Sequence, residues 1–152
     1  MKLIVNSFEE YHGNFQPWGV ICVNINDTYF PDEQWWDNSL SILEMWAYEI
    51  SIFIRGYTSE CNLSFMDGDY SILLVSSEIN KTLAYFKDPT GEVILSSIIE
   101  PLLFAQQILL EINKIQMQPI AFINPNIRHR LKNAEIEIRE SIDWFMPSYN
   151  HS

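Results

Sequence analysis

The side chains used most often in catalysis and metal binding are few in this chain of 152 residues. Its histidines are His12, His129 and His151, and its cysteines are Cys22 and Cys61. A catalytic histidine needs a partner within hydrogen-bonding distance, and no neighbouring sequence supplies one. The cysteines lack the Cys-x-x-Cys spacing of a zinc or redox site. We therefore expect no enzymatic activity, no cofactor and no metal, and we expect both cysteines to be free structural thiols.

Two pairs of acidic residues have spacings that could bind a cation or transfer a proton. Asp67-Gly68-Asp69 resembles the start of a calcium loop, but the acceptors and the glutamate that such a loop needs further on are missing. A tight hairpin turn is the favoured interpretation. Glu135 and Glu137 could form a carboxylate pair, whereas a solvated face is the more common reason for this pattern.

Acidic side chains outnumber basic ones and gather in the first half of the chain. There are 20 Asp and Glu against 9 Lys and Arg, which gives a formal net charge of −11. Residues 1–80 hold 12 acids and 2 bases, whereas residues 81–152 hold 8 acids and 7 bases. This acidity disfavours nucleic acid and anionic membranes as partners, because both are negatively charged. It favours a basic protein partner instead.

Many of the acids fall in segments that we predict to be loops, where binding residues concentrate. The most distinctive segment runs from Tyr29 to Asp37, because two tryptophans stand there among acids. Such aromatic side chains make good interface anchors, although both could also belong to the core. The predicted contact residues are the acids and aromatics of these loops: Asp27, Asp32, Glu33, Trp35, Asp67, Asp69, Tyr70 and Glu78.

Length and composition are typical of a globular protein with one domain, here residues 1–152 with 146–152 as a loose tail. Hydrophobic residues make up 47% of the chain and aromatic residues 14%, which is enough for a sizeable core. The first residues lack the apolar stretch of a signal peptide, and the longest apolar stretch, 40–54, is interrupted by polar residues. We therefore expect a cytoplasmic protein.

In the first half, the apolar pattern predicts strands and then one helix. Short strands are expected at 2–6 and 18–26, and Asn26-Asp27 should turn the second strand into 28–30 as a hairpin. Asp37 is the expected cap of a helix over 38–55 that ends at Gly56. A broad apolar face predicts that this helix is largely buried.

In the second half, four strand-like segments come first, at 61–66, 70–76, 81–87 and 92–96. The short links between them favour an antiparallel meander. Glu100-Pro101 should begin a second helix that runs to about Gln116. The predicted fold is α+β, with one antiparallel sheet of about five to seven strands and two main helices packed on it.

The segment 126–145 fits two interpretations. An apolar stripe from Ile127 to Phe145 favours one helix, whereas the alternation from Ala134 to Arg139 favours a short helix followed by a strand. Basic residues near the start of one long helix would oppose its dipole, so the two interpretations stay open.

Three short segments around the first predicted helix resemble a known group of proteins. They are Tyr29-Phe30-Pro31-Asp32, Trp36-Asp37 and Leu43-x-x-Trp46. In this pattern, and in its small, acidic α+β layout, the chain resembles the immunity proteins of bacterial polymorphic toxin systems. That group includes the immunity proteins of contact-dependent growth inhibition. The resemblance covers residues 29–46 and the general layout of the chain.

The resemblance implies a protein that binds one cognate toxin domain and neutralises it without catalysis. Many such toxins are nucleases with basic clefts, which an acidic protein can fill or flank. Opposite charges would speed association, and buried aromatic anchors would slow dissociation. The alternative is a non-catalytic structural or adaptor subunit of another assembly, which an exposed apolar face used for dimerisation would favour. The sequence leaves open whether the chain is a monomer or a homodimer.

Overall fold

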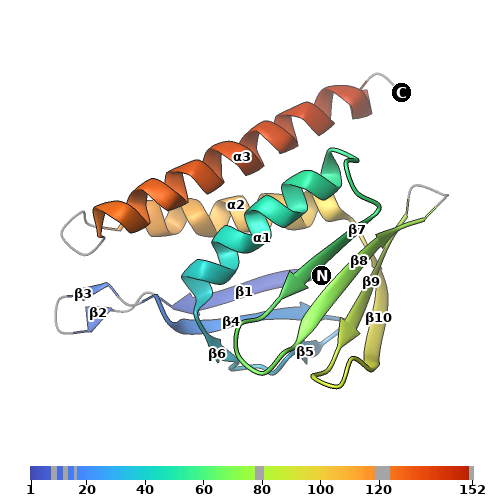
Figure 1. Ribbon diagram of the computed structural model, residues 1–152, viewed down its shortest axis with the longest axis horizontal. Coiled ribbons are helices and arrows are strands. Elements are labelled where there is room, and N and C mark those ends of the chain that lie inside the picture. Colours follow the sequence, from blue (N-terminus) through green and yellow to red (C-terminus); the bar gives the residue numbers. More distant parts are fainter. Residues whose placement is uncertain (8–9, 12–13, 16, 78–80, 119–123, 151–152) are drawn as a thin grey trace.

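The computed structural model describes residues 1–7, 10–11, 14–15, 17–77, 81–118 and 124–150. Its elements form three layers (Figure 1). Antiparallel strands make the first layer, the helices α1 (Ser39–Ile54) and α2 (Pro101–Gln116) lie against them, and α3 (Pro125–Asn150) packs on both helices. Within the described residues, none of the helices has the length and apolar character needed to cross a membrane.

The first sheet is built around β4 (Gly19–Ile25). β1 (Lys2–Ser7) pairs with one edge of β4. On the other edge, β5 (Thr28–Phe30) pairs with the last residues of β4, and β6 (Trp36–Asp37) pairs with its first residues. Asn26 and Asp27 both have positive φ angles, which is the geometry of a tight hairpin turn, so the predicted hairpin is confirmed. Between β1 and β4, β2 (Glu10–Tyr11) pairs with β3 (Asn14–Phe15).

The second sheet is a meander in which each strand pairs with the next along the chain. This order was predicted, but the strands form two four-stranded sheets and not the single sheet that we expected. Hydrophobic alternation identifies a strand but does not identify the strand with which it pairs. Along the chain, α1 separates the two groups of strands, and each group forms its own sheet. The strands of this sheet are β7 (Glu60–Ser64), β8 (Ser71–Ser76), β9 (Thr82–Lys87) and β10 (Val93–Ile99).

The start of α1 corrects one prediction. The N-cap is Asn38, whose side-chain oxygen accepts a hydrogen bond from the Ser41 amide at 3.1 Å. Asp37 does not cap the helix in this way, because its carboxylate accepts hydrogen bonds from Trp35, from the adjacent Asn38 amide and from two amides of another loop. The predicted end is confirmed, since Gly56 follows the helix with a φ of +78°.

Residues 125–150 form one continuous helix, which decides between the two interpretations of this segment. Leu131, Ala134 and Ile138 are buried on its inner side, whereas Ile136 is 44% exposed. Arg130 near the start of α3 binds Glu44 of α1, with 2.6 Å between Nη2 and Oε2, and this ion pair offsets its unfavourable position in the helix dipole. Residues 146–150, predicted as a loose tail, belong to the helix, and 151–152 lie outside the described residues.

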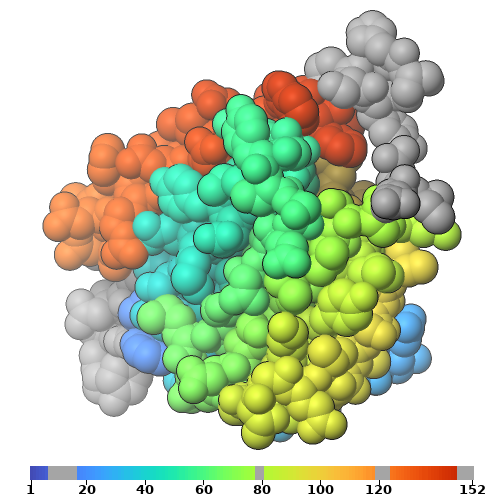
Figure 2. Space-filling view, turned by 45° about the vertical axis from the view of Figure 1, so that its right-hand side comes forward, coloured from blue at the N-terminus to red at the C-terminus, as the bar shows by residue number. Residues whose placement is uncertain are grey.

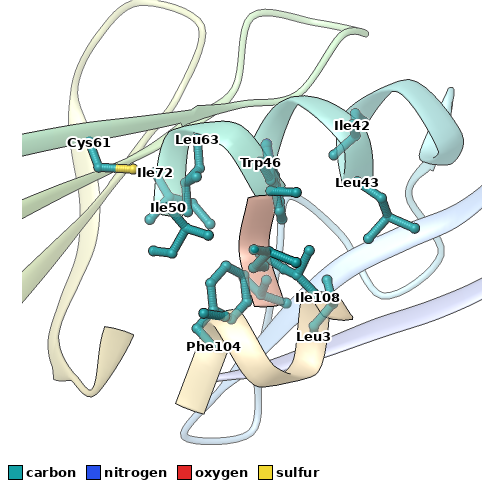
Figure 3. Close-up of a cluster of buried hydrophobic side chains, with 14 of the residues drawn as sticks. Leu3, Ile42, Leu43, Trp46, Ile50, Cys61, Leu63, Ile72, Phe104 and Ile108 are labelled. Carbon is teal, nitrogen blue, oxygen red and sulfur yellow. The ribbon is translucent and has the colours of Figure 1, made fainter. Parts of the chain in front are cut away.

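The hydrophobic core lies between α1, α2 and the two sheets, with Trp46 at its centre (Figure 3). The Trp46 side chain is fully buried, and its Nε1 donates a hydrogen bond to the carbonyl of Ser64 at 2.8 Å. Its ring meets Phe65 edge-on at a centroid distance of 5.1 Å and lies 5.9 Å from Phe104 of α2. One side chain therefore joins α1, the second sheet and α2.

Replacing Trp46 with alanine should lower the free energy of unfolding by about 3–5 kcal/mol, because it leaves a cavity at the centre of the core. Trp144 on α3 is 53% exposed, so Trp144→Ala should change stability by less than about 0.5 kcal/mol. Urea unfolding of the two variants beside the wild type measures both values. Equal destabilisation by the two variants would contradict this description of the core.

Candidate protein-binding site

The carboxylate of Asp37 is fully buried and joins two loops. Its Oδ1 accepts a hydrogen bond from the Asn38 amide at 2.7 Å, and its Oδ2 accepts one from Nε1 of Trp35 at 3.2 Å. Oδ2 also accepts the backbone amides of Met66 and Asp67, each at 3.0 Å. None of the ion pairs in the described residues includes Asp37, so four N–H donors compensate for the removal of its charge from water.

Each of the two loops is also anchored to the rest of the molecule. In the loop between β5 and β6, the carbonyl of Trp35 accepts a hydrogen bond from the Ile21 amide of β4 at 2.9 Å. In the loop between β7 and β8, the Phe65 amide donates to the carbonyl of Tyr70 at 2.9 Å. We call residues 31–37 and 65–70 together the acidic corner. Its backbone is held by hydrogen bonds at both ends and, through Asp37, at its centre.

Aromatic rings fill the space beneath the acidic corner. The ring of Tyr70 meets Trp35 edge-on at a centroid distance of 5.0 Å and meets Phe30 at 5.7 Å. Gly68 has a φ of +77°, and a Cβ atom there would lie 3.3 Å from the rings of both Trp35 and Tyr70. Glycine is therefore favoured at this turn, because its φ is positive and a Cβ atom would press on both rings. Phe30 also contacts Phe86 of β9 at 5.1 Å, so this group of rings joins the two sheets.

The structure brings together six of the eight predicted contact residues. Trp35 and Tyr70 are half-buried and touch each other, and four of the five acids of the acidic corner are exposed: Asp32, Glu33, Asp67 and Asp69. Asp27 is exposed but lies in the turn at the other end of β5, so it is separated from this group by the length of that strand. Glu78 lies outside the described residues.

Two exposed apolar side chains beside these acids were not among the predicted contact residues. Trp36 is 61% exposed and Met66 is 54% exposed. Trp36 pairs with Val20 of β4, and because side chains alternate along a strand, it points away from the core while Asp37 points inward. The adjacent pair Trp35-Trp36 was the sequence feature that indicated an exposed tryptophan, because two neighbouring side chains in a strand face opposite sides. Deciding which of the two tryptophans faces outward required the pairing of β6 with β4.

Ion pairs are distributed unevenly over the molecule. Every ion pair found in the described residues involves helical side chains or Arg55 at the end of α1. Arg55 bridges to Glu137 of α3 at 3.4 Å, for example. None of these pairs includes an acid of the acidic corner. Basic residues thus neutralise acids in the helical layers, while four carboxylates on the two loops keep their charge exposed to solvent.

The residues considered for chemistry occupy other parts of the structure. Glu135 and Glu137 do not form a carboxylate pair, because Glu135 binds Lys132 and Arg139 whereas Glu137 binds Arg55. Burial raises the pKa of Glu135, but hydrogen bonds from Arg139 and Lys132 outweigh this effect, so its pKa is lowered.

The three histidines are not gathered at one site. His129 on α3 is exposed and lies 3.3 Å from the Asn133 amide nitrogen, and His12 and His151 lie outside the described residues. Within the described residues, no group of three or more His, Cys, Asp or Glu could hold a metal ion. Neither observation adds a catalytic or metal site to the acidic corner.

Replacing Asp37 with asparagine should destabilise the protein by about 2 kcal/mol or more, because an amide nitrogen would face buried N–H donors. Asp69 is exposed and has a φ of +57°, which asparagine adopts readily, so Asp69→Asn is the matched control with little effect. Urea unfolding gives the stabilities, and hydrogen exchange of the Met66 and Asp67 amides gives the local effect. Slow exchange at these amides in Asp37→Asn would contradict the assigned role.

Both cysteines are free and buried, and burial is the main cause that raises their pKa values, to about 11 for Cys22 and about 12 for Cys61. A raised pKa leaves less reactive thiolate, by about 100-fold or more at about pH 8 for each cysteine. A thiol reagent should therefore react slowly with the native protein. After unfolding in urea, which removes the burial, it should react rapidly with both cysteines. Rapid reaction of either thiol in the native state would contradict this prediction.

No family model matches the chain, and no curated protein or solved structure matches it. The function of the chain is therefore inferred from its own residues and their geometry.

Proposed function

We propose that this chain is a non-catalytic protein that binds and neutralises a basic toxin domain in the cytoplasm, as the immunity proteins that its sequence resembles do. One observation carries the proposal. Four exposed carboxylates stand together on two loops that buried hydrogen bonds hold in place, and none of the ion pairs in the described residues includes them. A cluster of this kind attracts a positively charged surface.

The fixed backbone of the acidic corner favours tight binding. Ordering a flexible loop on binding costs free energy, and that cost is smaller where the loop is already held in one conformation. Here Asp37 binds the amides of Met66 and Asp67, so the carboxylates of the 65–70 loop keep their position relative to those of the 31–37 loop. The arrangement of charge that a partner would meet is therefore largely preformed.

Trp36 and Met66 supply the apolar part of the proposed interface. Both are more than half exposed, and both lie on the acidic corner beside the carboxylates. Interfaces commonly combine a few apolar anchors with a polar or charged rim, and exposed tryptophan is among the residues that contribute most. Trp36 can also stack with an arginine or lysine of a basic partner through its ring face.

A nuclease is the class of toxin that this chemistry fits best. Enzymes that act on nucleic acid bind its phosphates with lysine and arginine, so their clefts carry positive charge. Exposed carboxylates at fixed positions can take the place of those phosphates. The chain would then act by occupying or flanking the cleft, with no chemical step of its own.

The first test uses the gene that neighbours this one. The C-terminal domain of the protein encoded just upstream is expressed with and without the full chain, and growth and co-purification are measured. Rescue of growth together with a stable complex is the expected result. A harmless domain, or killing that this chain does not prevent, would contradict the proposal and favour a structural or adaptor subunit.

Reversing two charges of the acidic corner should weaken binding to the toxin domain. Asp32→Lys combined with Asp67→Lys should lower the affinity by about tenfold or more and flatten its dependence on salt, because opposite-charge pairs are lost. Glu92→Lys combined with Asp143→Lys changes the net charge equally at exposed positions outside the corner, so affinity should be nearly unchanged. Equal losses from the two double variants, measured by calorimetry, would show that only net charge matters.

A further inference from the structure

One segment of this acidic chain is basic. Residues 112–134 contain four lysines and arginines and no aspartate or glutamate, although the whole chain carries a net charge of −11. The described residues of this segment form the last turn of α2 and the first turns of α3. Figure 2 shows the start of α3 (orange) at the surface of the molecule. Positive charge is therefore concentrated where α3 begins beside the end of α2.

The two helices border an open hollow at this point. Among the described residues, its lining consists of Gln116 from the end of α2 and Pro125, Arg128, His129 and Lys132 from the start of α3. Its volume is about 550 Å³, which is in the range of binding sites for small molecules. Arg128 and Lys132 are four residues apart on one helix, so their side chains are neighbours on the same side of α3. The hollow thus brings two cationic groups together.

The charges beside the hollow do not cancel. Glu135 binds Lys132, with 3.2 Å between Nζ and Oε2, and it also binds Arg139, with 3.1 Å between Nη2 and Oε1. None of the ion pairs in the described residues includes Arg128. Three cations and one carboxylate therefore leave an excess of two positive charges in this group of residues.

Both cations of the hollow stand where a helix disfavours them. The start of α3 carries the positive end of the helix dipole, and like charges four residues apart repel each other. Arg130 in the same turns is compensated by Glu44 of α1, whereas Arg128 has no ion pair with a described residue. A locally unfavourable arrangement without an internal compensation is expected at functional sites. An anion in the hollow would reduce the repulsion and interact favourably with the dipole.

From the hollow and its excess of positive charge we infer a binding site for a small soluble molecule that bears a phosphate group. A phosphate monoester carries about two negative charges near neutral pH, which matches the local excess. The guanidinium of Arg128 can bind two phosphate oxygens through paired N–H donors, and the ammonium of Lys132 can bind a third. The site shares no residue with the acidic corner, so this inference does not depend on the proposed function.

The charge of the whole chain favours a small ligand over an anionic macromolecule. A net charge of −11 repels nucleic acid and anionic membranes, because their charge extends well beyond the hollow. A small anion experiences mainly the groups within about 8–10 Å at physiological ionic strength, because salt screens the more distant charges. An anion inside the hollow therefore meets the local excess of positive charge and is little affected by distant acids.

Titration of the full chain with inorganic phosphate and with pyrophosphate tests the site by NMR. The amide signals of Gln116, Arg128, His129 and Lys132 should shift together, with half-saturation at about 1 mM or below. Pyrophosphate should bind more tightly because it carries more charge. Sodium chloride at the same ionic strength is the reference. No saturation, shifts spread evenly over the molecule, or equal shifts with chloride would overturn the inference.

Two substitutions and a matched control locate the site. Arg128→Gln should weaken pyrophosphate binding by about tenfold, and Lys132→Gln should weaken it less, because Lys132 is shared with Glu135. Lys114→Gln is the control and should leave binding unchanged. The side chains of Lys114 and Lys132 are 58% and 60% exposed, and each binds a glutamate three residues away, but Lys114 does not line the hollow. Equal losses from the two lysine variants would show that only net charge matters and would overturn the inference.

Thermal unfolding separates loss of the site from loss of the fold. Without ligand, Arg128→Gln should unfold at the wild-type temperature or slightly above it, because a repelling cation is removed from the start of α3. Pyrophosphate should raise the unfolding temperature of the wild type and of Lys114→Gln more than that of Arg128→Gln. A clearly lower unfolding temperature for ligand-free Arg128→Gln would show that Arg128 stabilises the fold itself, and this result would overturn the inference.

Two further ligands distinguish the source of the anionic group. Phosphatidylcholine vesicles that contain phosphatidic acid present the phosphate group on a membrane, and polyglutamate presents carboxylates on a peptide. Both should bind more weakly than pyrophosphate, because their extended negative charge is repelled by the acidic chain. Co-sedimentation of the chain with the vesicles, or tighter binding to polyglutamate than to pyrophosphate, would overturn the assignment to a small phosphate-bearing molecule.

Discussion

The structure depends on a single buried carboxylate. Asp37 is the last residue of β6, close to the start of α1. Its oxygens accept hydrogen bonds from N–H groups of its own segment and of a loop thirty residues further along the chain. An acid out of contact with water is costly unless donors surround it, so the loops must keep the positions that bring their N–H groups to Asp37. The same contacts join the two sheets and hold the exposed acids of the two loops in place.

This arrangement also explains how a strongly acidic chain can be stable. Where acids and bases occur together, in α1, α2 and α3, they pair across and along the helices. Where acids lack basic neighbours, on the two loops, they are solvated and contribute little to folding. Packing around Trp46 and Phe30 supplies the contacts between layers instead. The acids of the acidic corner thus take no part in the ion pairs found among the described residues.

Elements whose pattern is local could be predicted from the sequence, whereas features determined by contacts between distant segments could not. Period-two and helical patterns located the meander, α1 and α2 to within a few residues, because each pattern reflects burial of its own segment. The continuity of α3 was left open because basic residues stand near its start, and the ion pair of Arg130 with Glu44 of α1 could not be seen from the local pattern. Most of the candidate site was predicted from its acids and aromatics, but the roles of Trp35, Trp36 and Asp37 depended on a strand pairing and a loop that no local pattern reveals.

The position of β1 has a consequence for the order in which the chain folds. The backbone of β1 exchanges hydrogen bonds with Gln107 of α2, which accepts from the Leu3 amide at 2.6 Å and donates to the carbonyl of Met1 at 3.2 Å. These contacts join residues 104 and 106 positions apart, so they close late, after the local hairpins have formed. During synthesis on the ribosome, the outer edge of β1 has to wait for α2 to emerge. Until then it exposes an unpaired strand edge, at which a nascent chain is most prone to misassociate.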